Sequence, residues 1–284
     1  MTPDKPAAGG NAFDSFYFAH CCGKPYARNE EWLRFFGGIA DRIVADLRPR
    51  RVLDAGCAFG FLVEALRNRG VEAFGIDLSP YAIEHVHESV KPYCRVGSVT
   101  DPLDGPYDLI VSIEVVEHME ARDAEIAIQN FCSQTDDLLL SSSPLDYREP
   151  THVNVQPPEV WAEQLARHGF FRDVDFDASF ITPWAGRFRQ AAEPIHRLVR
   201  QYERRYWLLQ HETSEARAYS MEVQGKLDEA ERACDALNLQ LASASSALGE
   251  AQQTIARMES SKFWKLRAAW VRLRNALGRD RTGR

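Results

Sequence analysis

Val52-Leu53-Asp54-Ala55-Gly56-Cys57-Ala58-Phe59-Gly60 is the stretch of sequence that decides the fold, and the helical pattern FLVEALRNRG follows it directly at residues 61–70. An acidic residue closes the apolar run, and small residues at 56, 58 and 60 let a ligand lie against bare backbone. The spacing is Asp-x-Gly-x-Ala-x-Gly, which differs from the Gly-x-Gly-x-x-Gly fingerprint of dehydrogenases. The stretch therefore predicts a strand, a ligand-binding turn and a helix, in that order.

The alternation of strand and helix continues toward the C-terminus. Short apolar runs at 71–77, 93–98, 107–113 and 137–143 are separated by helical stretches such as SPYAIEHVHESV, which Ser79 and Pro80 begin as N-cap and first residue. A Pro-started helix, EVWAEQLARHGF, and a last strand near 171–176 follow. Strands separated by helices form right-handed βαβ units. We therefore predict an α/β fold, with a Rossmann-like parallel sheet sandwiched by helices, over residues 50–183.

Two segments precede this domain. Residues 1–12 are rich in Pro, Gly and Ala, which predicts disorder. Residues 13–49 are rich in aromatic side chains, and Glu30 to Leu47 have the pattern of a helix that Pro49 ends. We expect residues 13–49 to form a helical lid over the mouth of the sheet, with packing against the core as the alternative.

The region after Pro194 contains no proline. Apolar or small residues recur there at alternating steps of four and three, from Tyr202 to Met258, so a heptad pattern holds for about eight repeats. This predicts a long helix and a coiled coil over residues 195–261, which would make the protein a homo-oligomer. A single solvated helix is the alternative, because alanines and two glycines weaken the seam.

Residues 262–284 differ in charge from the rest of the chain. They carry eight Lys or Arg and one Asp, a net charge of +7, whereas the whole chain has a net charge of -7. Five apolar side chains share one face of the predicted helix: Phe263, Leu266, Trp270, Leu273 and Leu277. Such a basic amphipathic helix suits an anionic membrane surface, so we expect peripheral contact with a membrane here.

Composition sets the class of protein. The 284 residues can fill one domain of up to about 200 residues and an appendage. No apolar run approaches the roughly 18 residues of a membrane span, and the N-terminus lacks the pattern of a secretory signal. The six cysteines show neither CxxC nor metal-ligand spacing, which predicts reduced thiols and no metal site. We expect a cytoplasmic protein, peripheral to the inner face of the plasma membrane through its tail.

The ligand-binding turn resembles motif I of the class I S-adenosylmethionine-dependent methyltransferases, in which a third glycine commonly stands at the position of Ala58. The next strand ends in Asp77, and the fourth leads into Glu114-Val115-Val116-Glu117-His118, which is similar to the family's motif after strand four. The later features look like those of small-molecule and glycan methyltransferases: His152-Val153-Asn154, Trp161 and Gly169-Phe170.

This resemblance implies S-adenosylmethionine as the cofactor, with Asp77 as the partner of both ribose hydroxyls. The residues that it assigns to cofactor binding are Asp54, Gly56, Cys57, Ala58, Gly60, Asp77, Leu78, Ser98, Val99, Glu114 and Val115. His118 and His152 are candidate catalytic bases, since the ordinary pKa of histidine suits proton transfer. For each of them a packed, structural histidine is the alternative.

The acceptor is inferred from the tail. Heptads followed by a basic helix resemble the tails of bacterial enzymes that assemble cell-surface polysaccharides, which implies O-methylation of a sugar hydroxyl in a cell-surface glycan or its membrane-linked precursor. The alternatives are another small molecule, such as a quinone or lipid precursor, and a non-catalytic coiled-coil scaffold that binds S-adenosylmethionine. A specific nucleic-acid partner is not expected, because the body is acidic and the N/D-P-P-[YF] motif is absent.

Overall fold

The computed structural model describes residues 12–191 and 193–279. The chain separates into two compact units, Met1–Arg205 and Tyr206–Arg284. The predicted disordered segment, residues 1–12, lies outside the described residues except for its last position.

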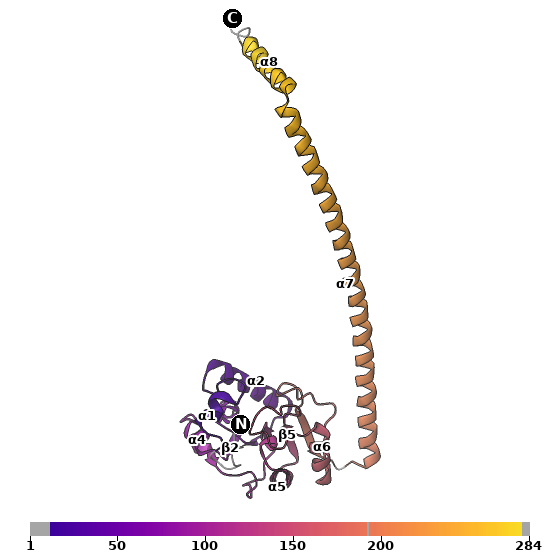
Figure 1. Cartoon of the computed structure of the whole chain (residues 1–284). Helices are drawn as coiled ribbons and strands as arrows, with labels where there is room; N and C mark the ends of the chain where they lie inside the picture. The colour runs from indigo at the N-terminus through magenta and orange to yellow at the C-terminus, as the bar shows by residue number, and fades with distance from the viewer. Residues whose placement is uncertain (1–11, 192, 280–284) are drawn as a thin grey trace, which may run out of the picture. The chain divides into compact units, whose positions relative to one another are not determined.

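The first unit is built on a seven-stranded sheet with the order β3-β2-β1-β4-β5-β7-β6 (Figure 1). The strands are β1 (Arg51–Ala55), β2 (Glu72–Asp77), β3 (Cys94–Val96), β4 (Leu109–Ile113), β5 (Asp137–Ser141), β6 (Phe170–Arg172) and β7 (Gly186–Gln190). β1 to β5 pair in parallel, so the predicted Rossmann-like α/β fold is confirmed. The order reverses between β1 and β4, and open α/β sheets bind ligands at the carboxyl ends of strands beside such a switch point.

One edge of the sheet departs from the predicted parallel arrangement. β7 is antiparallel to both of its neighbours, β5 and β6, so the sheet is mixed. Residues 173–185 join β6 to β7 without a helix, whereas a parallel return needs a long crossover connection. The sheet therefore extends to Gln190, past the domain end predicted at residue 183.

Helices cover both faces of this sheet: α2 (Glu30–Asp46), α3 (Phe61–Arg67), α5 (Ala121–Gln134) and α6 (Pro158–Arg167). α2 and α3 share one buried core with Val52, and α5 and α6 share the other with Leu53. Successive side chains of a strand point to opposite faces, which is why neighbouring residues of β1 belong to different cores.

The helix predicted to begin at Ser79 is present, but it is shorter than the predicted helical stretch SPYAIEHVHESV. The Ser79 hydroxyl accepts a hydrogen bond from the Ala82 N–H at 3.0 Å, and α4 spans only Pro80–Glu84. Beyond it, the His87 ring Nδ1 lies 2.7 Å from the Ser89 hydroxyl. Local side-chain bonds of this kind compete with helical geometry, which accounts for the early end.

The segment before the sheet is held by aromatic packing. α1 (Ser15–His20) places Phe18 against Phe59 of the ligand-binding turn, with ring centroids 4.7 Å apart. Tyr26 lies against the same ring at 5.2 Å. The predicted lid segment thus packs directly on the turn, and its motion on ligand binding stays a prediction.

The C-terminal part of the described chain consists of two helices, α7 (Ile195–Ser260) and α8 (Lys262–Arg279). The predicted long C-terminal helix is confirmed, and residues 280–284 of the predicted basic tail lie outside the described residues. The first turns of α7 belong to the first unit, where Leu198 is buried and the Tyr202 hydroxyl accepts a hydrogen bond from the Arg172 N–H. Farther on, the side chains of the heptad seam are exposed, and pairing of this seam with a second copy stays a prediction.

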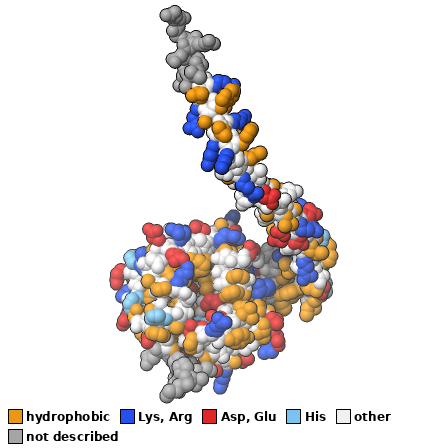
Figure 2. All heavy atoms as spheres, turned by 45° about the horizontal axis from the view of Figure 1, so that its top comes forward, with side chains coloured by type: hydrophobic (Ala, Val, Ile, Leu, Met, Phe, Trp, Pro, Cys, Tyr) orange, Lys and Arg blue, Asp and Glu red, His pale blue; other side chains and the backbone are white. Residues whose placement is uncertain are grey.

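On α8, Lys and Arg side chains are interleaved with hydrophobic ones, as Figure 2 shows. Within residues 12–191 and 193–279, no helix combines the length and apolar character that crossing a membrane requires.

Candidate active site

A cavity of about 880 Å³ lies at the carboxyl ends of β1, β2 and β4. This size suits a small-molecule ligand, since such pockets commonly enclose ~300–1,000 Å³. The predicted site residues that line it are Asp54, Gly56, Cys57, Ala58, Asp77, Leu78, Ser98, Val99, Glu114, Val115, His118 and His152. The fold thus brings together residues from distant parts of the sequence at the switch point of the sheet.

Gly60 is the predicted site residue that does not line the cavity. It begins α3 in the left-handed region (φ 70°), and a Cβ atom there would lie 3.1 Å from the Cys94 Sγ. Its N–H donates to the Cys57 carbonyl at 2.8 Å. Gly60 therefore shapes the turn from outside the cavity wall, and its contact with the cofactor stays a prediction.

Gly56 has the most restricted surroundings of the turn. Its φ is 89°, and an added Cβ would lie only 2.3 Å from Cγ2 of Val115. Only glycine adopts such a conformation without strain and leaves this space free. Gly56 lets the turn after β1 lie against the residues that follow β4.

Asp77 ties the end of β2 to the same turn. One carboxylate oxygen accepts the Ala58 N–H and the other accepts the Ser79 N–H, both at 2.8 Å. Each oxygen keeps a second lone pair, because an ionised carboxylate accepts about four hydrogen bonds. Ala58 has a φ of 46°, and the bond from its N–H to Asp77 helps to hold this left-handed conformation.

Asp54 is a second buried carboxyl group beside Asp77. Burial, together with the charge of Asp77, raises the pKa of Asp54 to about 8, and burial also raises the pKa of Asp77. None of the described residues that line the cavity is Lys or Arg. The two carboxyl groups therefore suit a ligand that brings hydroxyl groups and a positive charge.

The wall beyond Asp77 is a mixture of apolar and hydroxyl side chains. Leu78 is 43% exposed at the cavity, and Val99 lines it from the segment after β3. The Ser98 and Thr100 hydroxyls bond each other at 2.7 Å, which fixes this segment. An apolar surface of this kind can lie against the face of a flat ring.

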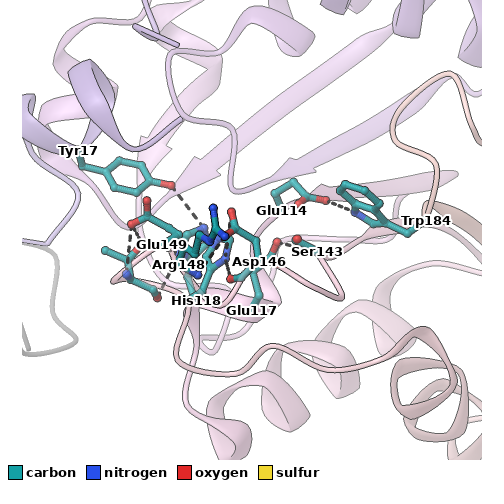
Figure 3. A network of polar contacts seen from close by, with 11 residues as sticks. Tyr17, Glu114, Glu117, His118, Ser143, Asp146, Arg148, Glu149 and Trp184 are labelled. Carbon is teal, nitrogen blue, oxygen red and sulfur yellow. Dashed lines mark hydrogen bonds and ion pairs between the residues drawn. The ribbon is translucent and has the colours of Figure 1, made fainter. Parts of the chain in front are cut away.

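Glu114 is held by its own protein neighbours. It follows β4 with a φ of 52°, and its carboxylate accepts hydrogen bonds from the Ser141 hydroxyl and from the indole N–H of Trp184, the latter at 2.9 Å (Figure 3). Strained residues of this kind gather at functional sites, where the surrounding structure over-determines them. Glu114 therefore presents a fixed carboxylate to the cavity.

Glu117 lies behind this group and is fully buried. Its Oε1 accepts a hydrogen bond from the Ser143 N–H at 3.0 Å, whereas its Oε2 has no hydrogen-bond partner among the described residues. Burial, followed by the charge of Glu114, raises the pKa of Glu117 well above its ordinary value.

His118 and His152 are in ring contact at the other end of the cavity, with centroids 4.5 Å apart. His118 Nδ1 lies 3.3 Å from the Thr151 carbonyl, and His152 Nδ1 lies 2.8 Å from the Asp146 carbonyl. A carbonyl can only accept, so each Nδ1 carries the proton and each Nε2 keeps its lone pair. Burial, with a contribution from His152, lowers the pKa of His118 to about 3, so His118 is neutral at neutral pH.

Glu117, His118 and His152 each offer a ligand atom within 4.8 Å of the others. The spacing in the sequence predicts no metal site, and the fold creates this grouping by bringing the loop around residue 152 to the end of β4. The Asn154 N–H donates to the Glu117 carbonyl at 2.9 Å and fastens that loop in place.

The methyltransferase domain family matches residues 26–172, just over half of the chain. This chain belongs to that family. The matched range holds the turn after β1, Asp77, both histidines and the lid segment from Tyr26 onward. The methyltransferase class predicted from the sequence is confirmed.

Curated relatives of this methyltransferase match over part of their length. The magnesium-protoporphyrin O-methyltransferase of Rhodobacter capsulatus is 32% identical over 91 residues, which is 30% of this chain and 41% of the relative. The ubiquinone biosynthesis O-methyltransferase of Methylococcus capsulatus is 36% identical over 81 residues, 26% of this chain and 34% of the relative. The chain thus spans less than half the length of these relatives.

A solved structure agrees with the fold. The magnesium protoporphyrin IX methyltransferase of Synechocystis PCC 6803, with bound S-adenosylmethionine, matches with a TM-score of 0.50 at 17% identity, over 64% of this chain and 97% of that chain. The cofactor predicted for the present methyltransferase is consistent with a fold of this kind.

Several residues of the methyltransferase site were not predicted from the sequence. The Tyr17 hydroxyl lies 3.4 Å from His118 Nε2, and Trp184 contacts Glu114 from the connection between β6 and β7. The many aromatic residues before the sheet are a sequence feature from which Tyr17 could have been predicted as a site residue. Trp184 gives no signal, because its contact depends on the return of β7 into the sheet.

Proposed function

We propose that this methyltransferase transfers the methyl group of S-adenosylmethionine to a hydroxyl group of a small, ring-bearing acceptor. The observation that carries the proposal is the pair of buried carboxyl groups, Asp54 and Asp77, facing a cavity at the switch point of the sheet whose described lining residues include no Lys or Arg. S-adenosylmethionine supplies what this space lacks, because it has two ribose hydroxyls, an ammonium group and a sulfonium centre.

Each chemical group of the cofactor can be paired with a part of the cavity wall along the edge of the sheet. Asp77, with one free lone pair on each oxygen, would accept both ribose hydroxyls, and Leu78 and Val99 would flank the adenine ring. Asp54 would face the ammonium group of the methionyl part, and Gly56 would let that part lie against the backbone. The sulfonium methyl would then point toward His118 and His152.

The protein needs to form no covalent bond with the substrate, since the methyl group of S-adenosylmethionine is already activated. The acceptor oxygen must lie in line with the methyl–sulfur bond in a space closed to water, and such alignment supplies about 7–11 kcal/mol. A new oxygen–carbon bond forms, the carbon–sulfur bond breaks to leave a thioether, and the hydroxyl proton must leave the acceptor. We propose that the Nε2 atom of His118 or of His152 accepts this proton.

The acceptor end of the cavity favours an apolar ring. Phe13 and Tyr17 line the cavity beside His118, with ring centroids 5.4 and 5.9 Å from its ring, and Trp32, Phe35 and Met119 add apolar surface to the cavity wall. The relatives named above are enzymes of porphyrin and ubiquinone biosynthesis by their names, and both kinds of ring are flat. We therefore propose a quinone-like or lipid precursor as the acceptor. O-methylation of a glycan sugar stays a prediction from the tail.

The pKa of Asp54 gives a test of the cofactor site. The pKa of Asp54 is about 8 in the free protein, so this carboxyl group is mostly protonated at neutral pH. An ammonium group beside it would stabilise the charged carboxylate. Binding of S-adenosylmethionine should therefore release a proton, and affinity should rise as the pH approaches about 8. Calorimetry at about pH 7 in phosphate and in Tris buffer measures this release, since the two buffers differ in heat of protonation.

Asp54→Asn is the matched control, because it keeps the size of the side chain and removes its titration. The buffer dependence of the binding heat should disappear in this variant. If the unchanged protein gave the same heat of S-adenosylmethionine binding in both buffers, the proposed contact between Asp54 and the ammonium group would be contradicted.

The basic helix α8 supports a second proposal, that the protein binds anionic membranes and meets a membrane-associated acceptor there. Phe263, Trp270 and Leu273 are 80%, 59% and 62% exposed. Basic residues surround them, and each Lys or Arg near an anionic surface contributes about 1 kcal/mol of attraction. The location on the inner face of the plasma membrane remains a prediction.

Phe263→Ser combined with Trp270→Ser should reduce co-flotation with vesicles that contain phosphatidylserine, because each apolar side chain buried in the interface contributes about 1.5–3 kcal/mol. Leu239→Ser is the matched control, as Leu239 is 74% exposed on α7 and outside the basic helix. Unchanged flotation of the double variant would refute this membrane contact.

A further inference from the structure

We propose that Trp184 and Thr182, on the connection between β6 and β7, determine which acceptor the cavity binds. Trp184 holds the carboxylate of Glu114 toward a hydroxyl of an uncharged ring, and the Thr182 hydroxyl bonds a second polar group of that ring. The inference rests on the methyl transfer proposed above, because it concerns the acceptor, but its test measures binding alone. Residues 173–185 follow the range that the family matches, residues 26–172, so membership of the family assigns them no role.

The connection between β6 and β7 is fixed against the body of the domain. Ala178, Ile181 and Ala185 are buried in the core that α2 and α3 share. Side chains carried on a packed segment are held in place more precisely than side chains on a free loop. Thr182 and Trp184 line the cavity between and beside these anchors, so they enter its wall from a rigid part of the chain.

Trp184 acts on Glu114. Its indole N–H donates to Oε1 of Glu114 at 2.9 Å, and the Ser141 hydroxyl donates to the same oxygen (Figure 3). A carboxylate accepts about four hydrogen bonds, so two protein donors leave Glu114 able to accept a bond from a ligand. Trp184 is therefore a positioning residue, since it fixes the orientation in which Glu114 meets that ligand.

The bonds of Glu114 run toward the half of the sheet away from the proposed cofactor carboxylates. Asp54 and Asp77 belong to β1 and β2, whereas Ser141 ends β5 and Trp184 precedes β7. In the sheet, β4 separates β1 and β2 from β5 and β7. In this proposal Glu114 binds the acceptor, in place of the contact with the cofactor that the sequence predicts.

Thr182 supplies an independent observation that points to a ligand. Its Oγ1 is buried and has no hydrogen-bond partner among the described residues, although Thr182 lies on the cavity wall. Buried polar atoms in native proteins are nearly always paired, and an unpaired one lowers stability. A hydroxyl both donates and accepts, so it suits a hydroxyl or carbonyl oxygen on a ring. An acceptor at this place satisfies Thr182.

The charge of the cavity wall opposes an anionic acceptor. Glu114, Glu120 and Asp146 lie on the wall, and none of its described residues is Lys or Arg. Burial lowers the pKa of His118 to about 3, so this ring adds no positive charge at neutral pH. A carboxylate on the acceptor would therefore lie among like charges without a counterion, which is costly away from bulk water. The wall favours an uncharged ring that carries hydroxyl groups.

The test compares catechol with protocatechuate, which is catechol with one added carboxylate. Each is titrated by nuclear magnetic resonance into the full chain saturated with S-adenosylhomocysteine, which fills the cofactor end of the cavity and has no methyl group to transfer. We expect the unchanged chain to bind catechol at least about 10-fold more tightly than protocatechuate, because like charges brought together cost more than one factor of ten in affinity.

Trp184→Phe keeps an aromatic ring and removes the N–H. It should weaken catechol binding about 10-fold, as the loss of one hydrogen bond to a charged group does, because Glu114 is no longer held toward the ligand. In a Glu114→Ala background the same substitution should cost less than about 2-fold, whereas a purely structural tryptophan would lose the same factor in both backgrounds. Glu114→Ala should also bring the affinities for catechol and protocatechuate closer together. Trp207→Phe is the matched control, since Trp207 is 61% exposed on α7.

Thr182→Val keeps the shape of the side chain and removes its hydroxyl. Catechol binding should weaken about 5-fold, which is the size of effect expected for one hydrogen bond between uncharged groups. Thr213→Val is the matched control, because Thr213 is exposed on α7. This control and Trp207→Phe should bind catechol as the unchanged chain does.

S-adenosylhomocysteine affinity is measured on the same samples as the check of fold and cofactor site, and it should change by less than a few-fold in every variant. A chain that binds S-adenosylhomocysteine but not catechol, or that prefers protocatechuate, would overturn the inference. Unchanged catechol affinity in Trp184→Phe and Thr182→Val would overturn it as well. Failure of the unchanged chain to bind S-adenosylhomocysteine would contradict the proposed function itself, and with it the inference.

Discussion

Asp77→Ala should lose at least about 100-fold in affinity for S-adenosylmethionine. Each hydrogen bond to a charged group contributes about 1.5–3 kcal/mol, and two ribose hydroxyls would donate to this carboxylate. A loss of about 3–6 kcal/mol corresponds to two to four factors of ten in affinity. The variant also loses the acceptor of the Ala58 and Ser79 N–H groups, which shape the cavity wall. Isothermal titration with S-adenosylmethionine measures the effect.

Asp101→Ala is the control for charge, because Asp101 is exposed on the same domain and is absent from the cavity wall. Its affinity should stay within a few-fold of the unchanged chain. Circular dichroism of Asp77→Ala should keep the signal of the folded protein. Retention of full affinity in a folded Asp77→Ala would show that the ribose does not bind at the end of β2.

Gly56→Ala should both destabilise the domain and abolish cofactor binding. The new methyl group would lie 2.3 Å from Cγ2 of Val115, and the φ of 89° is unfavourable for alanine. Strained conformations of this kind cost about 1–3 kcal/mol, and the turn must move away from the end of β4 to relieve the contact. Chemical denaturation and titration with S-adenosylmethionine measure the two effects.

Gly38→Ala is the matched substitution in α2, where an added Cβ meets no atom within 4 Å. In a helix interior this change should stabilise by about 0.5–1 kcal/mol. A loss of stability in Gly56→Ala together with a gain of stability in Gly38→Ala would support the described geometry of the turn. A Gly56→Ala protein as stable and as tightly bound as the unchanged chain would contradict it.

The parts of the fold that depend on local pattern could be predicted from the sequence. The turn from Asp54 to Gly60 and the acidic end of β2 each lie within one strand–turn–helix unit. The apolar period from Tyr202 to Met258 and the lack of proline after Pro194 predicted the long helix α7. Val52 and Leu53 alternate between the two cores as residues of a strand must. Local spacing was therefore sufficient to predict most of the residues of β1, its turn and β2 that line the cavity.

The parts that depend on long-range pairing could not be predicted. The antiparallel return of β7 is decided by the length and course of residues 173–185, which have no periodic pattern. Spacing also does not show which small residues of the turn face the cavity, where Gly56 and Ala58 line it and Gly60 does not. The grouping of Glu117, His118 and His152 arises only when the loop that Asn154 fastens lies beside the end of β4.

The measurement that tests the central claim most directly is transfer of a tritium-labelled methyl group from S-adenosylmethionine by the full chain. The acceptors would be a set of hydroxylated quinone precursors and, beside them, a lipid-linked sugar. We expect label in a quinone-type product, absent with Asp77→Ala and resistant to alkaline hydrolysis as an ether is. Binding of S-adenosylmethionine without transfer of label to any acceptor would contradict the account and favour a non-catalytic scaffold.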